Sequence, residues 1–221
     1  MRVDLHVHTT YSRDALTTCA EVARWAKRRQ LDAVAITDHN AIAGALAARA
    51  IAGLCVIVGE EIRTNQGEII GLFLEQQIEP GLSPEETIRL IRAQGGLVYV
   101  PHPLDRVRGS ALGYHTLARI LDQVDVIEAL NARVTFPMDN RLAQDVARAY
   151  RLAVGAGSDA HQGFEIGRAY VDMAPFSDAQ SFLANLGQAR ICGHISSPLV
   201  HVASACAKAA RELAPSFSLP R

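Results

Sequence analysis

Close to the start of the chain lies the stretch Arg2-Val3-Asp4-Leu5-His6-Val7-His8. It indicates both a β-strand and a possible metal site. Apolar residues alternate with polar ones, which is the pattern of a β-strand. Side chains two apart in a strand point to the same side, so His6 and His8 are within reach of one metal ion. Taken alone, this spacing also occurs where two histidines are ordinary polar residues of a strand.

Beyond this strand, short apolar runs alternate with longer amphipathic stretches to the end of the chain. We expect strands over residues 2–8, 32–37, 54–58, 67–74, 97–100, 124–128 and 152–156, with a later one at 169–173. We expect helices over residues 16–30, 41–52, 83–94, 114–122, 136–150, 177–189 and 198–213. The alternation predicts an α/β fold built from βα units around a parallel sheet of about seven strands.

The composition is that of one neutral globular domain. The chain has 221 residues, of which 49% are apolar, and its 22 basic and 23 acidic side chains leave a net charge of −1. Such a chain has no electrostatic reason to bind extended nucleic acid. No apolar run is long enough to span a membrane, no secretory segment follows Met1, and the four cysteines are widely separated. We therefore expect a cytoplasmic protein with reduced thiols.

Histidines and carboxylates gather where the predicted strands end. The motifs Thr37-Asp38-His39-Asn40, Gly59-Glu60-Glu61, Pro101-His102-Pro103 and Gly157-Ser158-Asp159-Ala160-His161 each follow a predicted strand. The carboxyl ends of parallel strands are where α/β folds build their sites. The candidate metal ligands are His6, His8, Asp14, His39, Glu61, Glu68, His102, Asp159 and His161.

This set contains nitrogen and oxygen ligands but no nearby thiolate, which suits zinc, manganese or ferrous iron. It offers more ligands than one ion can use, so two or three clustered divalent ions fit. Clusters of this kind activate water and stabilise the oxygens of an in-line displacement at phosphorus.

Five motifs in a fixed order also resemble those of a known family. They are Asp-Leu-His-Val-His-Thr at residues 4–9, Thr-Asp-His-Asn at 37–40, Gly-Glu-Glu at 59–61, Pro-His-Pro at 101–103 and Gly-Ser-Asp-Ala-His at 157–161. In this order the chain resembles the polymerase and histidinol phosphatase (PHP) family of metal-dependent phosphoesterases. The resemblance implies a single-domain, distorted (β/α)7 barrel of PHP type with a centre of two or three metal ions.

The resemblance also implies a role for each candidate ligand. A first ion would be held by His6, His8, Glu61 and Asp159. Glu61 would bridge to a second ion that also takes His102. A third ion would be held by Asp14, His39 and His161, which makes the centre trinuclear. The residues implied in catalysis are His6, His8, Glu61, Asp159 and His161.

Two departures from the family pattern bear on metal and substrate. Relatives among the nucleotide phosphatases often have a histidine at the start of the strand where this chain has Glu68. The extra negative charge of Glu68 favours a harder ion such as manganese. Those relatives also carry an inserted helical domain, whereas only about 20 residues separate Pro103 from Val124 here.

The predicted function is metal-dependent hydrolysis of phosphate esters of small metabolites, nucleotides or short oligonucleotides, by a hydroxide that bridges two metals. Arginine binds two phosphate oxygens at once, and 20 of the 22 basic residues are arginines. The candidates for substrate binding are Arg106, Arg108, Arg133 and Arg168. The protein would act without extended nucleic acid or membrane as a partner.

Two alternatives stay open at this point. An amidohydrolase-type metal hydrolase also uses a His-x-His strand, but it typically has a carboxylated lysine after a central strand, where neither Lys27 nor Lys208 falls. The second alternative is a non-catalytic, metal-binding PHP-like domain. We expect the barrel to span residues 1–196 and the C-terminal helix and tail, residues 197–221, to pack on it.

Overall fold

The structure is a computed structural model that describes residues 1–51, 53–197, 200 and 204. Its nine strands form one sheet in the order β7-β6-β5-β4-β3-β2-β1-β8-β9. The strands are β1 (Arg2–Val7), β2 (Ala33–Ile36), β3 (Cys55–Thr64), β4 (Gly67–Leu72), β5 (Leu97–Val100), β6 (Val126–Asn131), β7 (Ala153–Gly157), β8 (Ala169–Asp172) and β9 (Arg190–Gly193).

The sheet curls until its first and seventh strands meet, which makes a nearly closed, distorted barrel. The His8 amide donates to the Ala160 carbonyl at 2.9 Å, and the Asp159 amide donates to the His6 carbonyl at 2.7 Å. A parallel bridge joins Val7 to Ala160. The residues that follow β7 are therefore held against the carboxyl end of β1, where the predicted ligands lie.

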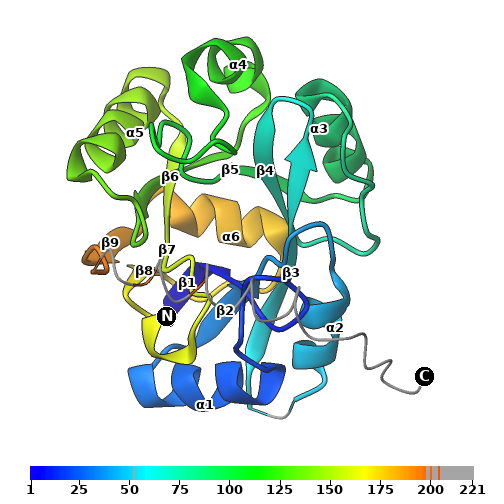
Figure 1. The fold of residues 1–221 in the computed structure, drawn as a ribbon, viewed down its shortest axis with the longest axis vertical. Coiled ribbons are helices and arrows are strands. Elements are labelled where there is room, and N and C mark those ends of the chain that lie inside the picture. The colour runs from blue at the N-terminus through cyan, green and yellow to red at the C-terminus, as the bar shows by residue number, and fades with distance from the viewer. Residues whose placement is uncertain (52, 198–199, 201–203, 205–221) are drawn as a thin grey trace.

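Helices cover the outside of the strands, as Figure 1 shows for α1 to α5, whereas α6 lies across the middle of that view. The helices are α1 (Cys19–Arg29), α2 (Ala43–Arg49), α3 (Pro84–Ala93), α4 (Gly113–Ile120), α5 (Pro137–Tyr150) and α6 (Ala179–Leu186), with short 3-10 turns η1 (Leu121–Gln123) and η2 (Gly163–Glu165). Phe182 and Leu186 of α6 join the same buried cluster as Leu5 and Tyr99. Helix α6 thus contributes to the apolar core of the barrel interior.

A β-bulge in β1 turns the two histidines inward. Asp4 is aligned with Val34 and Val7 with Ile36, so β1 carries one extra residue between these pairs. Leu5 belongs to the inner apolar cluster and Val7 to the cluster shared with the helices. Bulges of this kind re-aim side chains beside active sites. The strand is buried on both faces, because one face meets the inner apolar cluster and the other meets the cluster shared with the helices.

The predicted α/β class is confirmed, but the sheet is mixed. Strand β4 runs antiparallel to both β3 and β5, and β8 and β9 are antiparallel to their neighbours. Strand β9 was not predicted, because residues 190–193 adjoin a helix pattern and are too few to alternate visibly. Strand β3 continues to Thr64, well past the predicted end at residue 58, because it forms a hairpin with β4. Glu61 therefore lies within a strand.

The predicted C-terminal helix and tail, residues 197–221, lie outside the described residues except for Ser197, Val200 and Ser204. Among the helices that the structure describes, none has the length and apolar character needed to cross a membrane.

Candidate metal centre

The two histidines of β1 face each other at the centre of the site. Their Nε2 atoms lie 3.0 Å apart, and both side chains are fully buried. The opposite nitrogens are engaged, His6 Nδ1 with Glu128 at 3.1 Å and His8 Nδ1 with the Ser12 hydroxyl at 3.2 Å. Each ring is thus held from behind while its Nε2 points into a shared space.

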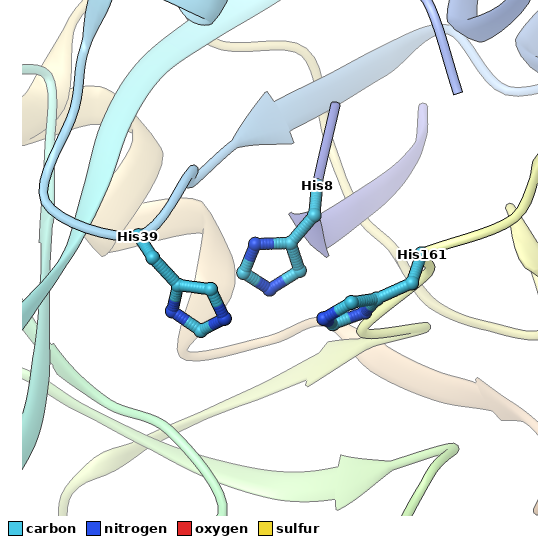
Figure 2. Close-up of side chains that lie close together, drawn as sticks. All are labelled: His8, His39 and His161. Carbon is cyan, nitrogen blue, oxygen red and sulfur yellow. The ribbon is translucent and has the colours of Figure 1, made fainter. Parts of the chain in front are cut away.

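Histidines from two further strand ends converge on His8. His39 follows β2 and His161 follows β7, and Figure 2 shows their rings turned toward the ring of His8. The ring centres of His39 and His161 lie 4.5 Å and 4.3 Å from that of His8. Asp14, in the loop after β1, completes this group, with its Oδ2 atom 3.7 Å from His39 Nε2 and 3.4 Å from His161 Nε2.

Two buried carboxylates lie between the histidines. Glu61 Oε2 is 3.5 Å from the Nε2 atoms of both His6 and His8 and 3.0 Å from His39 Nδ1. Asp159 Oδ1 is 3.3 Å from His8 Nε2. Neither oxygen accepts a hydrogen bond of good geometry. Buried oxygens are rarely left without a partner, so these two are suited to a cation.

Glu61 also joins His102, which follows β5, through a 2.9 Å contact between Oε1 and Nε2. Glu68 of β4 approaches the same nitrogen, with its Oε2 atom 3.8 Å from His102 Nε2. Its other oxygen is 3.4 Å from the Arg63 guanidinium. Glu68 thus reaches the cluster from a strand that is antiparallel to its neighbours.

Among the described residues, four groups of three side chains bring ligand atoms within 4.8 Å of one another, the spacing needed to hold an ion. They are His8, His39 and His161; His6, His8 and Glu61; His6, His102 and Asp159; and His39, Glu61 and Glu68. Together with Asp14, which contacts two of these histidines, the structure brings all nine predicted ligands into one cluster.

Electrostatics in the cluster keep two of its carboxylates ionised. Burial opposes ionisation of Asp159, yet Arg108 and the histidines around it hold its pKa well below the usual range. His6 and His39 likewise lower the pKa of Glu61 against the effect of burial. Burial and the neighbouring His161 and His39 lower the pKa of His8. The same carboxylates outweigh burial and raise the pKa of His6 and His39. Metal ions bind ionised carboxylates and neutral imidazoles, so an ion bound here would displace protons from these two histidines.

A cavity of about 640 Å³ adjoins the cluster and gives a ligand access to it. Asp14, His39, Glu68 and His161 contribute to its lining. Three arginines contribute as well, namely Arg63, Arg108 and Arg133. Its size is within the range of small-molecule sites.

Of the four arginines predicted to bind substrate, two line the cavity and two do not. Arg108 lines the cavity and donates from Nη2 to Asp159 Oδ2 at 2.6 Å. Arg133 lines it too, and it pairs with Glu165 at 3.3 Å and donates to the Ser204 hydroxyl at 3.0 Å.

The other two arginines, Arg106 and Arg168, do not line this cavity. Arg106 forms a 2.7 Å ion pair with Asp139 and lies over the ring of Phe136, beside a separate cavity of about 370 Å³. Arg168 contacts His194 at 3.3 Å at the surface.

Three residues at the site went unnoticed in the sequence. Arg63 follows the Gly-Glu-Glu motif by two positions, and its place at the cavity depends on the unpredicted extension of β3. Glu128 and Asn131 of β6 contact ligands without belonging to a metal-binding group. Their signal was available in the segment Glu128-Ala129-Leu130-Asn131, where two polar residues close an apolar strand at the ligand-bearing end.

Comparisons with known proteins agree with this architecture. A family model described as PHP-associated matches residues 137–191, from α5 into β9. The uncharacterized protein MJ1587 of Methanocaldococcus jannaschii is 42% identical over 142 residues, which are 58% of this chain and 82% of that protein. The uncharacterized protein MJ0417 of the same organism is 36% identical over 174 residues, which are 77% of this chain and 70% of that protein.

Solved structures share the fold at low sequence identity. One is a two-domain protein of Bacteroides vulgatus containing a predicted PHP-like metal-dependent phosphoesterase, with a TM-score of 0.64 and 19% identity over 88% of this chain. This chain spans 65% of that protein's length. PsfC of Pseudomonas syringae has a TM-score of 0.69 at 17% identity, over 95% of this chain and 98% of its own.

A third structure, an amidohydrolase of Chromobacterium violaceum with bound sulfate and no metal, has a TM-score of 0.61 at 20% identity, over 76% of this chain and 90% of its own. At such identities the likeness shows the fold. The fold and the buried cluster define a PHP-like barrel with a candidate metal site. The chain belongs to the same family as the two archaeal proteins, and its residues 137–191 match the PHP-associated model.

Proposed function

We propose that the protein is a metal-dependent phosphoesterase that hydrolyses phosphate esters of small metabolites, nucleotides or short oligonucleotides. The observation that carries this proposal is the convergence of five histidines and four carboxylates from six strands and their loops beside an arginine-lined cavity. Histidine and carboxylate ligands match zinc, manganese and ferrous iron, and arginine matches phosphate.

The unpartnered ligand atoms support two or three ion positions. His6, His8, Glu61 and Asp159 would hold a first ion, Glu61, Glu68 and His102 a second, and Asp14, His39 and His161 a third. Buried atoms without a hydrogen-bond partner occur in each set, among them Glu61 Oε2, Glu68 Oε2 and Asp14 Oδ1. Bound divalent ions would supply an activated water and neutralise charge on the phosphoryl oxygens. The extra carboxylate of Glu68 favours manganese over softer ions.

The chain's own cations would bind and orient the phosphate. Arg108 lies beside the cluster, because one of its nitrogens already contacts Asp159. Arg133 is buried at the cavity and fixed by Glu165, so it is preorganised. The net charge of −1 favours a small phosphorylated substrate over an extended nucleic acid, since no excess of basic residues is available to hold a long polyanion.

Amide hydrolysis is the second candidate, because a protein of similar fold is an amidohydrolase. The lysine chemistry typical of that class has no support in the described residues, where Lys27 lies on the last turn of α1. An amide substrate assayed beside the phosphate esters would decide between the two reactions.

Adding metal to metal-free protein tests the proposal directly. With Mn²⁺, Zn²⁺ or Fe²⁺, we expect hydrolysis of an aryl phosphate or a bis(aryl) phosphate and none without metal. An ion at 100 times its dissociation constant stabilises a protein by about 2.7 kcal/mol, which at this chain length raises the melting temperature by roughly 5–10 °C. Full metal loading of folded protein with no hydrolysis by any ion would instead identify a non-catalytic metal-binding domain.

Replacing Arg108 by alanine is expected to lower kcat/KM for the aryl phosphate by roughly 10- to 100-fold, as expected for a lost hydrogen bond to a charged group. Arg106→Ala is the matched control, because Arg106 lies outside the large cavity and pairs with Asp139. Steady-state kinetics of the two variants make the comparison. Equal losses in both would mean that Arg108 does not bind substrate.

A further inference from the structure

Glu128 of β6 is a buried carboxylate that belongs to none of the four groups able to hold a metal ion in the described part of the chain. Its two oxygens nevertheless lie at the centre of a hydrogen-bond network. The Tyr99 hydroxyl donates to Oε1 at 3.0 Å, and His6 Nδ1 lies 3.1 Å from the same atom. The His102 amide and the Asn131 side chain donate to Oε2 at 2.8 Å and 2.9 Å. One side chain therefore reaches candidate ligands from several strands.

The contact with His6 fixes the proton position on that imidazole. A carboxylate can only accept hydrogen bonds, so His6 Nδ1 must carry a proton. The Nε2 atom, which faces His8 and Glu61, is then the nitrogen available to a metal ion. Carboxylates that bind the far nitrogen of a ligating histidine both orient the ring and raise its basicity.

The hydrogen bond between Glu128 and His102 is made by the backbone amide of His102. His102 has φ of 29°, outside the common conformations of a non-glycine residue. Its amide hydrogen bond to Glu128 helps to hold this conformation, in which the side chain reaches Glu61 at 2.9 Å. Strained residues persist where the surrounding contacts over-determine them.

The third connection runs through Asn131. Its Nδ2 group donates to Glu128 Oε2 and, at 3.1 Å, to Asp159 Oδ2. Arg108 donates to the same Asp159 oxygen. Because both donors occupy Oδ2, the other oxygen, Oδ1, is left facing the histidines.

We propose that Glu128 is the positioning residue for one half of the metal cluster, formed by His6, His102 and Asp159, and that His39 and His161 of the other half are positioned by different contacts. In the other half, His8 Nδ1 and the His39 amide contact the Ser12 hydroxyl, and the backbone of His161 is held by a different buried carboxylate, Glu165. Glu165 accepts the amides of His161 and Gln162 at 3.1 Å and 2.9 Å. This inference rests on the proposed metal-dependent function of the same site.

The test compares Glu128→Gln with Glu165→Gln in metal-free full-length protein. Glutamine has the shape of glutamate but turns one acceptor into a donor, which opposes the donors around Glu128. Zn²⁺ binding is measured by equilibrium dialysis, and the protonated and ligated nitrogens of each histidine are read from spectra of ¹⁵N-histidine-labelled protein. Loss of an outer contact of this kind weakens metal binding by about 10- to 100-fold.

We expect Glu128→Gln to weaken Zn²⁺ binding and to remove the Zn²⁺-induced shift of His6 and His102, while the shifts of His39 and His161 remain. Glu165→Gln should spare His6 and His102. Wild-type Zn²⁺ affinity in Glu128→Gln, or loss of the same histidine signals in both variants, overturns the proposal. Tyr99→Phe keeps Glu128 and serves as a folding control, because it removes one donor and should leave the proton on His6 Nδ1.

These measurements need no turnover. A wild-type protein that binds Zn²⁺ but hydrolyses no phosphate ester with any ion would contradict the proposed function, and the comparison of the two variants would still decide the role of Glu128.

Discussion

Replacing His8 by alanine is expected to abolish metal-dependent hydrolysis in a protein that still folds. His8 belongs to two of the four groups able to hold an ion, one with His6 and Glu61 and one with His39 and His161. Its loss removes a ligand from both. Metal ions supply several kcal/mol of transition-state stabilisation, so we expect kcat/KM to fall on the order of 10³-fold or more.

The measurement pairs kinetics with metal content. His8→Ala should bind fewer ions than the wild type, and adding metal should raise its melting temperature by less. His115→Ala is the matched control, because His115 is exposed on α4 and contacts no member of the cluster in the described structure. Turnover of His8→Ala at the wild-type rate would place the active site elsewhere.

The second large effect is expected from Gly157→Ala, at the end of β7. A Cβ atom there would lie 2.3 Å from the Cβ of His6 and 2.9 Å from its backbone nitrogen. Real atoms do not approach so closely, and backbone cannot swing aside as a flexible side chain does. Strand β1 or β7 must move, and overpacking of this kind costs about 1–3 kcal/mol.

At this chain length such a cost lowers the melting temperature by roughly 2–12 °C. Because the displaced residue is His6, we also expect weaker metal binding. Thermal unfolding and metal titration of Gly157→Ala are compared with Gly187→Ala, where the nearest atom to the new Cβ lies 3.5 Å away. If both variants melt like the wild type, the close approach of β1 and β7 described above is wrong.

Much of the fold was predictable from local pattern. The strand at residues 97–100 and the helix over 136–150 match β5 and α5 closely, because a short apolar run and a long amphipathic stretch are set by the residues themselves. Strand direction was not predictable in this way. β4 is antiparallel because it returns along β3 as a hairpin, and β9 depends on an edge that β8 offers.

For the candidate site too, part was predictable from the sequence and part depends on the tertiary structure. The motifs by themselves predicted the chemistry, since histidines and carboxylates at strand ends indicate candidate metal ligands by residue type. Tertiary structure decided which side chains share that site. Arg108 reaches Asp159 across 51 residues, whereas Arg106, two positions away, turns to Asp139.

Glu128 is the clearest case, because its importance lies in contacts with residues from other strands. Residue type and spacing are properties of the chain and can be read from it. Contacts between distant segments depend on how the barrel closes, on the bulge in β1 and on the missing side chain at Gly157, and these exist only once the chain has folded.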